Sequence, residues 1–161
     1  MKKEQLYIAV KGALVVLLAA MIIPHFVMPK NSNVPFDTVV QKTTAGLDME
    51  LYPSCTAQDI KRYLGLVPSQ YEQVAFYRTS DALNASELLI VQFKEDGQAA
   101  DFEQKIGERM RSQEKIYAGY APEQEQLVKD GIVFVRANYA LYMVGAQAPL
   151  AKQQFAQSLQ G

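Results

Sequence analysis

The chain has 161 residues, of which 49% are hydrophobic, and its formal net charge at pH 7 is −1. This near-neutral balance, without a dense basic stretch, leaves little to neutralise phosphates and so disfavours nucleic-acid binding. The single cysteine excludes an internal disulfide, and with only one histidine a transition-metal site would have to be built largely from carboxylates.

The first feature along the chain is an apolar run from Leu6 to Met28. About 23 helical residues at roughly 1.5 Å each are long enough to cross a hydrocarbon core of about 30 Å. Lys11 lies near the inner end, where its amine can reach the interface. Lys2 and Lys3 precede the run and only Lys30 follows closely, which favours a cytoplasmic N-terminus. We therefore predict a cytoplasmic tip and transmembrane signal anchor in residues 1–28, with residues 6–28 in the bilayer.

A cleaved signal peptide is the alternative interpretation of this run. The stretch from Phe26 to Lys30 has no small-x-small pattern for a signal peptidase, so we expect the segment to be retained. No cysteine follows closely enough to carry a lipid, since Cys55 lies well downstream. The expected location is a single-pass cell-membrane protein with an extracytoplasmic C-terminal domain.

Residues 29–35 are polar and bounded by prolines, which predicts a short linker, and residues 36–161 form the predicted domain. Asp37 is expected to cap a first helix that carries Val39 and Val40. A second helix begins after Thr56 as N-cap and stops at Gly65.

Two strands are predicted next, at 72–79 and 87–94, because apolar and β-branched residues are concentrated there. A helix follows over 98–113, with Ala99, Phe102, Ile106 and Met110 as its apolar stripe. Two further strands, at 132–136 and 139–144, are joined through Ala137 and Asn138, where asparagine tolerates a left-handed conformation.

A closing helix is predicted over 149–159. The order is thus α-α-ββα-ββα, which predicts an α+β fold: a four-stranded antiparallel sheet with helices packed on one face.

No catalytic or cofactor motif is present, so we predict no catalytic, cofactor-binding or metal-binding residues. A nucleophilic Cys55 would need a histidine, and the only one, His25, belongs to the membrane segment. Cys55 is more simply a small residue at the start of a helix. A site assembled from distant carboxylates is not excluded by sequence, so enzyme activity stays open, although a non-catalytic role is expected.

The stretch from Ile116 to Gln126 is predicted as a tyrosine-rich connection. Its functional interpretation is an interaction surface formed by Tyr117, Tyr120, Glu123 and Glu125, because tyrosine offers a large contact area at low entropic cost. The alternative interpretation is structural: the tyrosines fix the helix exit onto the sheet and the two glutamates face water.

The residues Tyr117-Ala118-Gly119-Tyr120-Ala121-Pro122-Glu123, followed by the run from Gly131 to Val144, resemble an uncharacterised bacterial exported family, domain of unknown function 4358. The resemblance covers about residues 37–159. It implies a lipoprotein or a single-span protein of a Gram-positive bacterium, with no assigned activity and no site residues. The chain departs from the lipoprotein members because it lacks a lipidated cysteine.

The expected function is a membrane-anchored, non-catalytic protein-binding or accessory module of the bacterial cell envelope, with an envelope protein as partner and no cofactor. One alternative is a small-ligand receptor or carboxylate-based hydrolase, which requires a concave pocket lined by polar groups. The other is a structural spacer.

Overall fold

The computed structural model describes residues 11–12, 16 and 31–160 of the chain. The chain divides into two units, Met1–Lys30 and Asn31–Gly161. The predicted transmembrane segment falls almost entirely outside the described residues. Within the described ranges, none of the helices combines the length and the apolar character needed to cross a bilayer.

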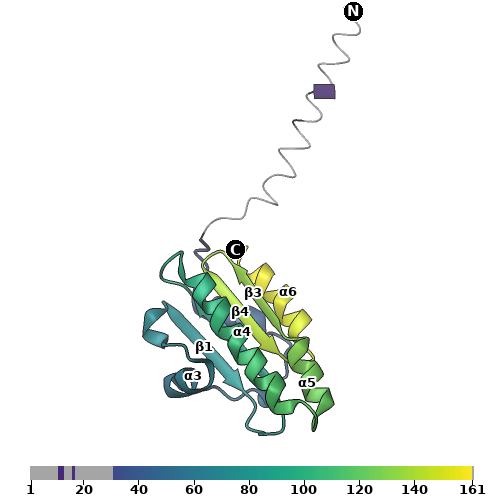
Figure 1. Cartoon of the computed structure of the whole chain (residues 1–161). Coiled ribbons are helices and arrows are strands. Elements are labelled where there is room, and N and C mark those ends of the chain that lie inside the picture. The colour runs from purple at the N-terminus through teal and green to yellow at the C-terminus, as the bar shows by residue number, and fades with distance from the viewer. Residues whose placement is uncertain (1–10, 13–15, 17–30, 161) are drawn as a thin grey trace, which may run out of the picture. The chain divides into compact units, whose positions relative to one another are not determined.

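A four-stranded antiparallel sheet forms the centre of the second unit (Figure 1). Its strands are β1 (Gln73–Arg78), β2 (Glu87–Gln92), β3 (Ile132–Arg136) and β4 (Tyr139–Val144), in the spatial order β1-β2-β4-β3. The β1–β2 and β3–β4 hairpins join where β2 pairs with β4. The predicted α+β class and antiparallel four-stranded sheet are therefore confirmed.

Helices cover both faces of this sheet. One face packs against α3 (Ala57–Leu64), α4 (Gln98–Tyr117) and α5 (Pro122–Lys129), and the other packs against α2 (Phe36–Thr44) and α6 (Ala148–Ser158). Side chains of the central strands alternate between the two cores, so that Leu89 and Tyr142 belong to the first and Leu88 and Leu141 to the second. The prediction that the helices pack on one face is wrong. All six residues of β4 are buried because the sheet has no solvated face there.

The predicted caps of α3 are confirmed, whereas the predicted cap of α2 is wrong. Thr56 caps α3 through a reciprocal capping box with Asp59, and Gly65 ends the helix in a left-handed conformation, as predicted. Asp37 does not cap α2: Pro35 occupies the N-cap position, and Asp37 lies in the first turn. In the β3–β4 turn, the residue with positive φ is Ala137 rather than Asn138.

The segment after the long helix is more regular than predicted. Helix α4 continues to Tyr117, four residues beyond the predicted end, and α5 begins at Pro122, so the predicted connection contains a helix. Pro122 is the first residue of α5, a position where proline is common. Glu123 and Glu125 lie in the first turn, where carboxylates interact favourably with the helix dipole. Short 3-10 turns at Met49–Leu51 and Pro68–Gln70 complete the described fold.

Candidate functional site

The four residues of the predicted interaction surface differ in exposure. Tyr117 ends α4 with only 4% of its surface exposed, whereas Tyr120, in the turn before α5, is 57% exposed. Their ring centroids are 6.0 Å apart. Glu123 is exposed, and the partly buried Glu125 pairs with Lys129 at 2.6 Å between Oε1 and Nζ. Tyr117 thus fixes the helix exit, while Tyr120 and Glu123 are presented to solvent.

Two further large apolar side chains are exposed on segments that adjoin α5. Ile116, in the last turn of α4, is 56% exposed, and Leu83, in the loop between β1 and β2, is 66% exposed. The backbone N–H of Ala85 donates to Oε1 of Gln124 at 2.9 Å, which holds this loop against α5. We call Leu83, Ile116, Tyr120 and Glu123 the Tyr120 surface. Sequence reasoning missed Leu83, whose only signal was an apolar residue within a polar loop.

A buried ion pair lies between the sheet and α4. Arg109 Nε and Nη2 donate to the two carboxylate oxygens of Glu87 at 3.0 and 2.9 Å. The Glu87 side chain has no solvent-exposed surface, and that of Arg109 is 12% exposed. The Tyr142 hydroxyl donates to Glu87 Oε1 at 2.6 Å, and Gln113 Oε1 lies 3.4 Å from the same hydroxyl. These contacts give each carboxylate oxygen of Glu87 at least one hydrogen-bond donor.

This environment shifts the pKa of two of its members. Burial, reinforced by the Glu87 charge, raises the pKa of Tyr142 well above 10, so its hydroxyl stays protonated. Burial alone would lower the pKa of Arg109, but its hydrogen bonds and charge interaction with Glu87 outweigh this and raise it. Arg109 and Tyr142 therefore both keep their protons near neutral pH, because both pKa values are raised, which suits a structural role.

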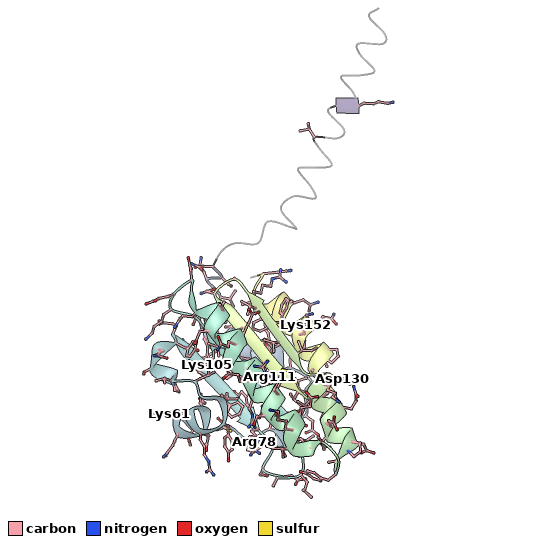
Figure 2. All side chains as sticks on the ribbon, viewed as in Figure 1. Lys61, Arg78, Lys105, Arg111, Asp130 and Lys152 are labelled. Carbon is pink, nitrogen blue, oxygen red and sulfur yellow. The ribbon has the colours of Figure 1, made fainter. Side chains whose placement is uncertain are left out.

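A second arginine, Arg78, lies near the ion pair and stacks on the same tyrosine ring as Arg109. The Arg78 guanidinium lies 4.5 Å from the ring centroid of Tyr63, and Nη1 donates to the Thr79 carbonyl at 3.3 Å. Arg78 is the last residue of β1 and is labelled in Figure 2. Arg109 is 5.7 Å from the same ring. Within the described part of the chain, Arg78 forms no salt bridge, so most of its donors are available to a bound anion.

Neither an activated thiol nor a cluster of metal ligands is found among the described residues. Burial raises the pKa of the Cys55 thiol, which lowers the thiolate fraction that a nucleophile needs. Among residues 31–160, no three histidine, cysteine or carboxylate side chains are grouped as ligands for a metal ion. A cleft of about 440 Å³ lies beside the start of α2.

The fold and these features define a small α+β domain with a helix-covered antiparallel sheet, a buried ion pair and an exposed aromatic surface. The chain belongs to the family described as Domain of unknown function (DUF4358), which matches residues 46–145. This match confirms the family resemblance, and its span includes the whole sheet, the ion pair and the Tyr120 surface. No curated protein matches the chain. No solved structure matches it either.

Proposed function

We propose that this protein is a single-pass, membrane-anchored module of the bacterial cell envelope whose extracytoplasmic domain binds a protein partner through the Tyr120 surface. The exposure of Leu83, Ile116 and Tyr120 on adjoining segments carries the binding proposal. The apolar run over residues 6–28 and the lysines before it support the anchor. Anchoring favours a binding role because it concentrates a small domain at the membrane, where weak contacts suffice.

The composition of the surface fits protein docking. Single exposed apolar residues are ordinary, but three large ones on neighbouring segments are typical of interaction sites. Tyrosine and arginine are the residues most often found at the energetic centre of interfaces. The Tyr120 ring packs against the buried Tyr117 ring, which restricts its motion. A side chain held in this way loses less entropy on binding.

Charge further defines the partner. Arg78 is the last residue of β1, just ahead of the Leu83 loop, and forms no salt bridge with residues 31–160. Glu123 is exposed three residues after Tyr120. A partner that offers an apolar recess for Tyr120, an acidic group for Arg78 and a basic group for Glu123 complements both charges.

The proposal is tested by photo-crosslinking in intact membranes. A photoreactive amino acid at the exposed Ala118 reports on the surface without removing Tyr120, and one at the exposed Gln153 on α6 is the matched control. We expect a discrete protein adduct from position 118 that disappears when Leu83→Ser is added, and no such adduct from position 153. Equal adducts from both positions, or an adduct unaffected by Leu83→Ser, would contradict the proposal.

A further inference from the structure

The cleft beside α2 is built by four separate segments of the domain. It is lined by residues 31–37 ahead of and within the start of α2, by the beginning of β1, by the end of β2 and by the β3–β4 turn. The segment ahead of α2 is held in place, because Ser32 N donates to Asn138 Oδ1 at 2.8 Å and the Tyr139 hydroxyl donates to the Val34 carbonyl at 2.7 Å. Its volume of about 440 Å³ is in the range of small-ligand sites.

The walls of the cleft carry side-chain amides and carboxylates, most of which form no side-chain hydrogen bond with residues 31–160. The side-chain amides are those of Asn31, Asn33, Gln73, Gln92 and Asn138. Of these, only Asn138 forms a side-chain hydrogen bond within the described part of the chain, and its NH₂ group remains available. The carboxylates of Asp37 and Glu72 also line the cleft, and neither forms a salt bridge or side-chain hydrogen bond with residues 31–160. A ligand entering the cleft therefore meets both donors and acceptors.

The charge of the walls selects the class of ligand. Among the described residues that line the cleft there is no lysine, arginine or histidine, so a phosphate or carboxylate would face Asp37 and Glu72 without a compensating cation from these walls. The described residues hold no group of three carboxylate, histidine or cysteine side chains that could bind a metal ion, and the two carboxylates of the cleft give less charge than a dedicated divalent-cation site usually has. Amides and carboxylates that converge without a base match a neutral ligand rich in hydroxyl groups, because each hydroxyl both donates and accepts.

The apolar part of the wall limits the strength of binding. Val34, Pro35 and Phe36 line one side, but the Phe36 ring is 6% exposed and lies against Tyr139 with ring centroids 6.3 Å apart. It therefore offers no open face for stacking on a sugar ring, and hydrogen bonds must supply most of the affinity. We propose that this cleft is a low-affinity binding site for a neutral saccharide, with Asn33, Gln73 and Gln92 as its principal hydrogen-bonding residues.

The test uses the full chain in lipid nanodiscs, since sugar-headgroup detergents would compete. Side-chain amide signals are followed by ¹H–¹⁵N NMR during titration with glucose, N-acetylglucosamine and maltose, and separately with sodium phosphate and methylammonium. The double variant Asn33→Ala/Gln73→Ala removes two amides that form no described hydrogen bond, so the fold should persist. Gln153→Ala, which removes an exposed amide outside the cleft, is the matched control.

We expect at least one of the saccharides to shift the amide signals of the cleft, and the double variant to bind it about tenfold more weakly. The Gln153→Ala variant should bind as the unaltered protein does. No response to any of the three saccharides would overturn the proposal. Undiminished binding by the double variant, or a response to phosphate or methylammonium alone, would overturn it as well. None of these outcomes depends on the Tyr120 surface.

Discussion

Replacing Arg109 by methionine tests the energetic role of the buried ion pair. The substitution keeps most of the side-chain volume but leaves the fully buried Glu87 carboxylate without its cation. Breaking a buried pair in this way costs about 3–5 kcal/mol, a large fraction of the roughly 5–15 kcal/mol that stabilises a typical domain. For a domain of this size the thermal midpoint should fall by about 10–20 °C.

An exposed ion pair on the same helix provides the matched control. Lys105 Nζ lies 2.8 Å from Asp101 Oδ2, a separation close to that of the buried pair, but its side chain is 29% exposed and that of Asp101 is 57% exposed. Lys105→Met should cost only about 0.5 kcal/mol, because water screens the pair. The difference between the two variants therefore isolates the effect of burial.

The assay is equilibrium urea unfolding of the full chain, followed by circular dichroism and by tyrosine fluorescence, which is available because the chain has nine tyrosines and no tryptophan. The double variant Glu87→Leu/Arg109→Met should be more stable than Arg109→Met alone, because it removes the stranded charge. It should remain below the unaltered protein, since Tyr142 keeps only the 3.4 Å contact with Gln113. A loss below about 1 kcal/mol for Arg109→Met would refute this reasoning.

Three further predictions concern packing and pH. Gly145→Ala places a methyl group against the Tyr52 hydroxyl at a positive φ of 155°, and should destabilise the domain by about 1–3 kcal/mol in the same urea assay. Hydrogen bonds from Thr56 lower the pKa of Asp59 below 3.8, so their stabilising effect is present above this pH and is lost as the pH falls through the folded-state pKa; the acid unfolding curve of Asp59→Asn should lack this component. Burial raises the pKa of Tyr139 from 10.0 to about 12. The contribution of its protonated hydroxyl to the stability of the fold is therefore complete below pH 10 and is lost as the pH rises toward 12. An ultraviolet tyrosinate titration compared with Tyr139→Phe should show this.

The elements whose signals are local could be predicted closely from the sequence. The helix after Thr56 was predicted from its capping residues and its stop at Gly65, and the structure contains both. Strands β3 and β4 occupy the predicted residues because their apolar runs are bounded by a two-residue turn. Each of these signals lies within a few residues of the element that it specifies.

The features that depend on tertiary arrangement were predicted less well. The four apolar residues in a row within β2, 88–91, are all buried, and such a run could have indicated that helices cover both faces of the sheet. Helix α5 was not predicted, because Gly119 and the tyrosines before it indicated a connection instead. Pro122 and the acidic residues that follow it are nevertheless typical of a helix start. The contact of Glu87 with Arg109 joins residues 22 positions apart, and no local pattern predicts which cation a buried strand carboxylate will meet.

The candidate surface was predicted in part. Tyr120 and Glu123 are exposed, but Tyr117 is a packing residue and Glu125 is engaged with Lys129. Leu83 joins the surface only because the β1–β2 loop is held against α5 through Gln124. The sequence therefore indicated the chemistry of the surface, while its extent depends on the fold.

The most direct test of the proposed function is quantitative affinity capture of the full-length protein from gently solubilised membranes, in three forms: unaltered, Tyr120→Ala and Leu150→Ala. Leu150 is the control because it is also a large apolar residue exposed to solvent, 40% accessible, but lies on α6. We predict that one protein is recovered with the unaltered and Leu150→Ala forms and reduced at least tenfold with Tyr120→Ala, while circular dichroism shows that all three are folded. Equal recovery with all three forms would contradict the assignment of the Tyr120 surface as the binding site.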